Sequence, residues 1–323
     1  MTRGVVGIGG GIGASRFWRA LLRVLEPAEL TLVVNTGDDL WQHGLRICPD
    51  LDTTLYALSG RQDAQRGWGL SGETFRCMDA LRDLGQEVWF NLGDRDLATH
   101  LLRTGLLGDG TSLSEVTAVL ARAMGVGVRV LPMTDDMVTT HVVTTAGAVL
   151  HYEEFLVRHQ AAPEVAEVRY TGAGRAVPAP GVLAAIADAG LVVLAPSNPL
   201  ASICPVLAVP GIRAALRTTA APVLAVTPIV SRVPISDPGE RLRAASRAGL
   251  LAARGLPPTA AAVASLYRDL CRHFVLDAAD AVECDAVRAA VRDVIVVPTL
   301  PGTGPPDDVL ARAVLGARRH EAV

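Results

Sequence analysis

Short, uninterrupted runs of apolar residues, each followed directly by a polar or glycine-rich turn, constrain the fold of this sequence more than any other feature. The runs are Val5–Ile8, Thr31–Val34, Leu191–Ala195, Val223–Val226 and Val294–Val297. Because their apolar side chains are continuous rather than alternating, we expect strands that are buried on both faces. Such strands are typical of a parallel sheet that is covered by helices on both sides. The pattern therefore predicts an α/β fold.

The first two runs are joined by a glycine-rich loop and a helix. Gly9–Gly13 follows the first strand, and apolar residues at helical spacing predict a helix from Ala14 to Leu25. A strand, a helix and a second parallel strand in this order form a βαβ unit. Further helices are predicted at Leu113–Met124, Gly239–Arg254, Ala260–Cys271 and Asp307–Arg318. The sequence thus predicts a doubly wound, mostly parallel, Rossmann-like sheet.

A segment at about residues 135–175 has a different pattern. Polar and apolar residues alternate there, as in Val149–Tyr152, and Ala146-Gly147 and Gly172–Gly174 mark turns. Alternation with frequent turns is typical of antiparallel strands. We expect a single large α/β domain over residues 1–323, with this segment inserted into the parallel core or lying at its edge.

Composition excludes several classes of protein. All 30 basic residues are Arg, and the net charge is −3. The absence of Lys excludes a Schiff-base mechanism and a P-loop, and the charge balance does not fit nucleic-acid binding. Five scattered cysteines argue against a disulfide framework or a structural zinc site, and no apolar run approaches the ~18 residues of a membrane span. We expect a cytoplasmic enzyme that acts on small molecules.

The glycine-rich loop fits the dinucleotide-binding fingerprint G-x-G-x-x-G/A at Gly9, Gly11 and Ala14. Its glycines let the backbone approach a diphosphate, and the helix that follows presents free N–H groups. An NAD-dependent oxidoreductase would also need an acidic residue at the end of the second strand, where this chain has Asn35. This argues against NAD, although Asp38 lies close by. The alternative is a tight strand–helix turn without a ligand.

Four carboxylates follow the second strand within a short stretch, namely Asp38, Asp39, Asp50 and Asp52. Like charges this close repel one another unless a cation lies among them. Mg²⁺ favours carboxylate oxygens and typically takes one or two of them together with substrate phosphates. The alternative is that Asp52 or Thr53 caps a short helix over residues 54–58.

A third polar cluster, Leu92–His100, contains Arg95, which can bind a phosphate through two guanidinium nitrogens. In the alternative interpretation, Asp94 caps the helix that follows and Arg95 is solvated. Trp41 and Trp68 lie in polar, glycine-rich surroundings. They either stack on a planar ligand or pack in the core or a lid.

Together these motifs resemble the 2-phospho-L-lactate transferase family of deazaflavin (coenzyme F-420) biosynthesis, including its members that use phosphoenolpyruvate. The resemblance runs from the N-terminus to about residue 235 and continues weakly to about residue 300. Its main segments are Gly9–Phe17, Asn35–Asp39, Cys48–Thr53, Leu92–His100, Leu131–Asp136 and Ala195–Pro199. Ala14-Ser15 and Cys204 depart from the glycines that we expect in the family.

The resemblance implies a Mg²⁺-dependent transferase. Enzymes of this family join the GDP-activated form of a phosphorylated three-carbon acid, phosphoenolpyruvate or 2-phospho-L-lactate, to the deazaflavin Fo. The terminal ribityl hydroxyl of Fo attacks the acid-side phosphorus, and GMP leaves. Family resemblance also suggests a homodimer. The alternative is a regulatory protein that binds nucleotide sugars, because the related gluconeogenesis factors share the glycine-rich loop.

The same resemblance implies which residues form the site. The backbone N–H groups of Gly10, Gly11 and Gly13 are expected to hold the diphosphate. Asp38 and Asp52 are expected to bind Mg²⁺ or to orient the attacking hydroxyl, two roles that the sequence does not separate.

Further polar residues are expected to contact the two substrates. Asn35 and Arg95 would position phosphate or deazaflavin groups, and Asp52 and Asn91 lie where the family contacts the deazaflavin. The residues expected at the guanosine nucleotide or its phosphates are Ser197, Asn198 and Ser202.

Overall fold

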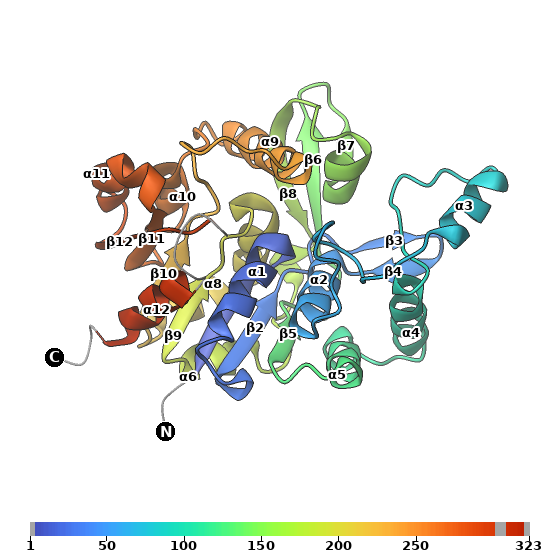
Figure 1. The fold of residues 1–323 in the computed structure, drawn as a ribbon, viewed down its shortest axis with the longest axis horizontal. Helices are drawn as coiled ribbons and strands as arrows, with labels where there is room; N and C mark the ends of the chain where they lie inside the picture. The colour runs from blue at the N-terminus through green and yellow to red at the C-terminus, as the bar shows by residue number, and fades with distance from the viewer. Residues whose placement is uncertain (1–3, 301–307, 320–323) are drawn as a thin grey trace.

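A seven-stranded parallel sheet forms the centre of the protein, as Figure 1 shows for a computed structural model of the chain. The structure describes residues 4–300 and 308–319. The strand order is β12-β11-β10-β9-β1-β2-β5. The strands are β1 (Val5–Gly9), β2 (Leu30–Val34), β5 (Arg129–Pro132), β9 (Leu191–Leu194), β10 (Val223–Val226), β11 (His273–Asp277) and β12 (Asp293–Val297). Every neighbouring pair is parallel, which confirms the predicted fold class.

Helices cover both faces of this sheet. Val5 of β1 packs in one buried cluster and Val6 packs in another, because successive side chains of a strand point to opposite faces. The first cluster includes residues of α1 (Gly11–Leu21), α2 (Pro49–Leu58), α5 (Leu113–Met124) and α12 (Asp308–Gly316). The second includes residues of α6 (Val182–Asp188), α7 (Cys204–Ala208), α8 (Ile212–Thr218), α9 (Pro238–Ala252), α10 (Ala260–Leu266) and α11 (Cys284–Arg288).

Two smaller sheets accompany the parallel one. The strands β6 (Thr139–Thr144), β7 (Val149–His151) and β8 (Val165–Thr171) are antiparallel in the order β7-β6-β8, which confirms the predicted antiparallel segment. The hairpin of β3 (Leu40–Gln42) and β4 (Leu45–Ile47) lies beside α4 (Asp96–Gly108), and α3 (Arg76–Asp83) projects farther out (Figure 1). A small apolar cluster of Leu40, Ile47, Met78 and Leu92 stabilises this lobe.

The chain reverses its direction across the sheet between β1 and β9. From β1 it runs outward through β2 to β5, and after β9 it runs the other way through β10 and β11 to β12. In doubly wound sheets, ligands bind beyond the carboxyl ends of the strands at such a reversal. Gly10, Asn35 and Ser197 all follow strands at this end of the sheet.

Some predicted boundaries are wrong. The helix predicted from Ala14 to Leu25 begins at Gly11 and ends at Leu21, because the glycines themselves form its first turn. The helix predicted after Asp52 begins at Pro49, and proline is favoured in a first turn because it has no N–H to leave unsatisfied. Asp52 and Thr53 therefore lie inside α2 and are not its N-cap residue.

Two strands of the parallel sheet, β5 and β11, are not predicted from the sequence. β5 is a partly exposed edge strand that contains Pro132, and β11 follows directly on a stretch that was assigned to a helix. That helix, predicted to reach Cys271, ends at Leu266. The predicted start of the last helix, Asp307, lies outside the described residues.

No single helix within residues 4–300 and 308–319 is long and apolar enough to span a membrane. The adjacent helical segments Pro199–Ala208 and Ile212–Thr218 reach that length and composition only when they are taken together, and they are bent by 87°.

Candidate active site

A cavity of about 1120 Å³ lies at the carboxyl ends of the parallel strands. Gly10 lines it after β1, Ser197 after β9, Thr227 after β10 and Thr299 after β12. Pockets for one small ligand usually measure about 300–1,000 Å³. The cavity is therefore larger than the usual pocket for one small ligand.

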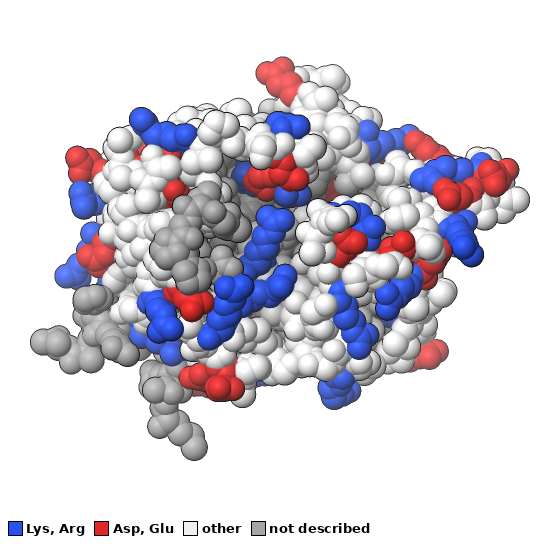
Figure 2. Space-filling model, viewed as in Figure 1, with Lys and Arg blue, Asp and Glu red and all other residues white. Residues whose placement is uncertain are grey.

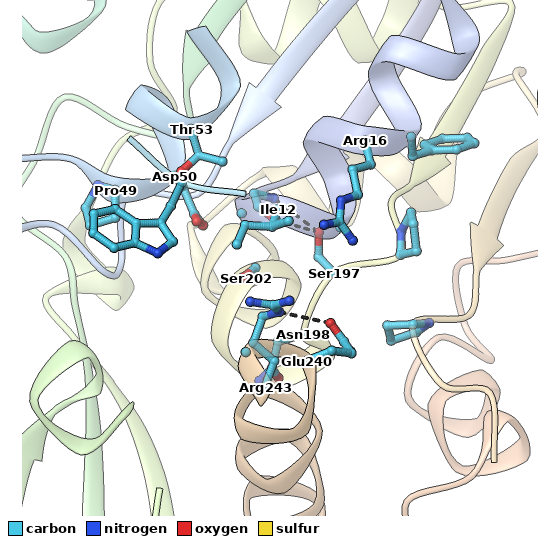
Figure 3. Close-up of a pocket in the computed structure, with 18 of the residues that line it drawn as sticks. Ile12, Arg16, Pro49, Asp50, Thr53, Ser197, Asn198, Ser202, Glu240 and Arg243 are labelled. Carbon is cyan, nitrogen blue, oxygen red and sulfur yellow. Dashed lines mark hydrogen bonds and ion pairs between the residues drawn. The ribbon is translucent and has the colours of Figure 1, made fainter. Parts of the chain in front are cut away.

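The glycine-rich loop forms one wall of the cavity and continues directly into α1 (Figure 3). Gly10 is the N-cap residue of α1, and no side chain caps the free N–H groups of this helix. The Ser197 hydroxyl donates to the Gly10 carbonyl at 2.8 Å and accepts from the Gly10 N–H at 3.3 Å. A Cβ atom on Gly13 would clash with the carbonyl oxygen of Pro196. Close packing thus brings the amino end of α1 to the cavity, where an anionic ligand is favoured.

Asn35 connects the end of β2 to α2. Its amide Nδ2 donates to Oδ2 of Asp50 at 2.9 Å, and its Oδ1 accepts from the Gly37 N–H at 2.9 Å. Asp50 lines the cavity, whereas Asn35 lies behind it and is fully buried. Asn35 therefore positions both Asp50 and the turn that carries Asp38.

Three buried carboxyl groups, those of Asp38, Asp50 and Glu153, line the cavity and interact electrostatically. Burial, and then the charges of Asp50 and Glu153, raise the pKa of Asp38 well above its usual range. Burial and the Asp50 charge also raise the pKa of Glu153. Burial raises the pKa of Asp50 as well, against the opposing effect of the hydrogen bond from Asn35. These groups would be stabilised by a cation among them.

Within the acidic cluster of Asp38, Asp50 and Glu153, the carboxylates of Asp38 and Asp50 are hard oxygen donors of the kind that a divalent cation favours. Oδ1 of Asp38 is buried without a hydrogen-bond partner in the described part of the chain. No group of three or more His, Cys, Asp or Glu side chains within residues 4–300 and 308–319 could hold a metal ion by itself. An ion held here would thus take further oxygens from water and from a substrate phosphate, as Mg²⁺ usually does.

Asp52 lies in a separate buried network. Both of its carboxylate oxygens accept from the guanidinium of Arg103 on α4, with 3.1 Å between Oδ2 and one nitrogen. Nδ1 of His100 accepts from Arg103 at 3.2 Å, because a guanidinium can only donate. Asp52 still lines the cavity, but its charge is already paired. The structure thus favours Asp50 over Asp52 as the partner of Asp38, and the role of Asp52 as a metal ligand stays a prediction.

Asn198 and Ser202 also reach the cavity. Oδ1 of Asn198 caps the π-helical turn at Pro199–Ile203 by accepting from the N–H groups of Leu200 and Ala201 at 3.1 and 3.2 Å. Its Nδ2 donates to the Tyr152 hydroxyl at 3.3 Å. Asn198 therefore has a structural role at this wall, and contact of Asn198 and Ser202 with a nucleotide stays a prediction.

The segment from Leu92 to His100 is only partly in the cavity. Asn91 lines the cavity and accepts from Arg82 at 3.2 Å. Arg95 is exposed and outside the cavity, and its guanidinium donates to the Ser71 carbonyl at 2.5 Å. The structure thus does not bring Arg95 to the other expected site residues.

The helix caps around Arg95 differ from the expected ones. The carboxylate of Asp94 accepts from the N–H groups of Arg76 and Cys77 at 3.1 and 3.0 Å, so it caps the preceding helix, α3. The following helix, α4, is capped instead by Glu73, which accepts from the N–H groups of Arg95 and Asp96 at 2.8 Å each. Glu73 precedes α3 but caps α4, and Asp94 precedes α4 but caps α3. The spacing of these residues in the sequence does not reveal this arrangement.

Aromatic side chains line another wall of the cavity, namely Tyr56, Trp68, Trp89 and Phe90. Trp68 is 38% exposed and packs beside Phe75, with 6.4 Å between ring centroids. Trp41 is 55% exposed and lies outside the cavity. Of the two tryptophans singled out from the sequence, Trp68 alone is placed to stack on a ligand there.

Sequence reasoning did not assign a role to several charged residues that line the cavity, among them Asp50, Glu153, Arg243 and Arg247. Asp50 is one of the four carboxylates noted in the sequence. A helix that begins at Pro49 points the side chains of Asp50 and Asp52 in different directions, and this spacing could have distinguished the two residues. Glu153 and the two arginines lie on segments that only the tertiary fold brings to the cavity. Nothing in their local sequence marks them.

The chain is similar to known proteins in both sequence and fold. Residues 5–299 match the family model described as "2-phospho-L-lactate transferase CofD". A phosphoenolpyruvate transferase of Streptomyces griseus is 43% identical over 291 residues, which cover 88% of this chain and 89% of the relative. One of Nocardia farcinica is 46% identical over 238 residues, 72% of each chain. A crystal structure of a UPF0052 family protein from Bacillus halodurans has the same fold, with a TM-score of 0.61, 17% identity, and coverage of 98% of this chain and 99% of that one.

Proposed function

This chain belongs to the 2-phospho-L-lactate transferase family, and we propose that it transfers a phosphorylated three-carbon acid to the deazaflavin Fo in coenzyme F-420 biosynthesis. The acid, phosphoenolpyruvate or 2-phospho-L-lactate, would enter in its GDP-activated form. The ribityl hydroxyl oxygen of Fo forms a bond to the acid-side phosphorus, the bond to the bridging oxygen breaks, and GMP leaves with that oxygen. The hydroxyl proton passes to a base.

The observation that carries this proposal is that the acidic cluster and the glycine-rich loop line the same cavity, with the Asp50 carboxylate packed directly against Gly10. The first turn of α1, at Gly11 and Gly13, supplies backbone N–H groups for the diphosphate. Asp38 and Asp50 are the residues that would hold Mg²⁺, which when bound neutralises the charge that develops on the phosphate oxygens. Positioning and neutralisation of charge are the main needs of phosphoryl transfer.

The attacking hydroxyl needs a group that accepts its proton. A carboxylate whose pKa is raised toward neutrality is a better base at neutral pH than an ordinary one. Burial and neighbouring charges raise the pKa of both Asp38 and Glu153, which line the cavity. Asp52 is less suited to this role because Arg103 already pairs with its carboxylate.

The aromatic wall is the place for the deazaflavin. Trp68 and Phe90 offer flat apolar surfaces in the cavity, and Asn91 adds a polar group beside them. A planar heterocycle stacks favourably on such rings. With the glycine-rich loop at the other wall, the cavity can hold the nucleotide donor and the deazaflavin acceptor together.

The test is product formation by the purified protein. Fo and Mg²⁺ are incubated with the GDP-activated forms of phospholactate, phosphoenolpyruvate and phosphoglycerate in turn, and products are identified by mass spectrometry. We expect one donor to give the phospho-acid adduct of Fo and an equal amount of GMP, and EDTA to abolish both. Binding of nucleotide sugars without any product from the three donors would instead support the regulatory alternative.

A further inference from the structure

The α9 helix contributes two arginines to the cavity, on the side that faces the glycine-rich loop. Arg243 and Arg247 line it, together with Glu240 of the same helix. Figure 3 shows Glu240 and Arg243 opposite Ile12 and Arg16. In the space-filling view, basic side chains gather at the hollow between these elements (Figure 2). A polyanionic ligand in the cavity would therefore meet guanidinium groups from two directions.

A chain of hydrogen bonds fixes α9 in this position. The Ser246 and Tyr152 hydroxyls lie 3.2 Å apart, and Tyr152 also accepts from Asn198 at 3.3 Å. Ser246 immediately precedes Arg247, and Tyr152 immediately precedes Glu153. The network thus links α9, the acidic cluster and the end of β9. Arg247 is consequently held at a fixed place relative to the rest of the cavity.

Glu240 orients the two guanidinium groups without using all of their donors. It accepts from Nε of Arg243 at 2.9 Å and from one terminal nitrogen of Arg247 at 2.6 Å. Burial raises the pKa of Glu240, but the two arginines outweigh this and lower it, so Glu240 is ionised. Asp237 lies 3.6 Å from Arg243. Among residues 4–300 and 308–319, Arg247 has no other hydrogen-bond or ion-pair partner than Glu240.

The side chain of Arg247 is only 11% exposed, although a guanidinium has five N–H donors. Taking a cation out of water is unfavourable unless hydrogen bonds replace the lost water. The nitrogen atoms of Arg247 that have no partner are accessible rather than buried, and the residue lines the cavity. Their planar arrangement matches the two oxygens of a carboxylate or phosphate.

We propose that Arg247, oriented by Glu240 and supported by Arg243, binds an oxyanion of the nucleotide-activated donor. This inference rests on the proposed function. The donor carries a carboxylate on its three-carbon acid as well as its diphosphate, and in a chain without lysine arginine is the side chain that offers a permanent positive charge to such groups. The deazaflavin acceptor has neither a carboxylate nor a phosphate, so the subsite is specific for the donor.

The experiment compares Arg247→Ala and Arg247→Lys with the wild type, measuring the KM of the donor, the KM of Fo and the calorimetric affinity for Mg²⁺–GDP. We expect Arg247→Ala to raise the KM of the donor about tenfold to a hundredfold, as expected for a lost hydrogen bond between charged groups. The KM of Fo should stay within about twofold of the wild-type value. Arg247→Lys should restore only part of the loss, because an ammonium group lacks the planar fork.

The GDP titration distinguishes the two possible oxyanions. Weaker binding of GDP by Arg247→Ala places a nucleotide phosphate at the subsite, whereas unchanged GDP affinity with a raised donor KM places the carboxylate of the acid there. Arg122→Ala is the matched control, because Arg122 is an exposed arginine of α5 outside the cavity.

An unchanged donor KM in a folded Arg247→Ala protein, or equal changes in the KM values of donor and Fo, would overturn the proposal. If Arg247→Ala does not fold, Arg247→Lys and Arg243→Ala take its place under the same criteria. Failure of the proposed function is distinct, because the wild type would then form no product at all.

Discussion

The amide of Asn35 donates a 2.9 Å hydrogen bond to the carboxylate of Asp50, and this bond joins the end of β2 to the first turn of α2. It holds an acidic side chain at the cavity although burial and the charge of Asp39 oppose its ionisation. Two residues farther on, Asp52 also lines the cavity, but its carboxylate is paired with Arg103. Two acidic residues of one helix thus have different partners, an amide for Asp50 and a guanidinium for Asp52.

Asp50→Asn and Asp52→Asn should have opposite effects on stability. Asp50→Asn removes one charge from a repelling cluster, so we expect the melting temperature to be unchanged or higher at pH 8, while turnover falls at least a hundredfold. Asp52→Asn leaves Arg103 buried without its charged partner, and we expect the free energy of unfolding to fall by about 3 kcal/mol. Thermal melts and product assays check both variants. Equal stability of the two would show that the ion pair contributes nothing.

Glu153→Gln should stabilise the protein in a pH-dependent way. Burial and the Asp50 charge raise the pKa of Glu153 to about 8, above that of an unfolded glutamate. The folded state then binds the proton more tightly, so ionisation of Glu153 destabilises the fold progressively as the pH rises from about 4 to about 8. Glutamine cannot ionise. We therefore expect a melting temperature a few degrees above the wild type at pH 8.5 and a smaller difference at pH 5.

The same melts test whether a cation binds at the acidic cluster. Added Mg²⁺ should stabilise the wild type more at pH 8.5 than at pH 5, because the carboxylates must be ionised to bind it. Glu153→Gln should weaken this response. If the difference in melting temperature between Glu153→Gln and the wild type did not change with pH, that result would contradict the raised pKa of Glu153.

Gly13→Ala should disrupt the glycine-rich loop. A methyl group there would meet the backbone carbonyl of Pro196, which cannot rotate away as a flexible side chain would. We expect loss of donor binding and a lower melting temperature. The matched control is Gly105→Ala on α4, where a Cβ atom meets nothing within 4 Å and the better helix propensity of alanine should add up to about 1 kcal/mol of stability. Donor affinity of Gly13→Ala equal to that of the control would count against the packing argument.

Trp68→Ala should weaken binding of the deazaflavin, and Trp41→Ala should not. Trp68 lines the cavity, whereas Trp41 is exposed outside it. Loss of a stacked ring should reduce the affinity for Fo about threefold to tenfold. Titration of each variant with Fo provides the measurement. A similar loss in both variants would point to an indirect effect of the substitutions.

Much of the architecture follows from local patterns in the sequence. Continuous apolar runs predict five of the parallel strands, and alternation predicts the antiparallel segment, because burial on two faces or on one face selects these patterns directly. β5 and β11 are not predicted, because each has only three apolar residues or fewer in an unbroken run: β5 is an edge strand that ends in a proline, and β11 has His273 and Asp277 at its two ends. The polar strand ends at Gly10, Asn35 and Ser197 also follow from the sequence, since the direction of parallel strands places them at one edge.

What the sequence alone determined is thus a βαβ-based parallel sheet with a phosphate-binding type of loop and acidic residues at its carboxyl edge. Only the tertiary structure decided that Arg103 pairs with Asp52, whereas the amide of Asn35 holds Asp50. Positions 50 and 52 are about 200° apart around a helix, so their side chains meet different neighbours. Glu153 and Arg247 reach the cavity through β7 and α9, far along the chain. Such convergence depends on long-range packing, which leaves no periodic signal in the sequence.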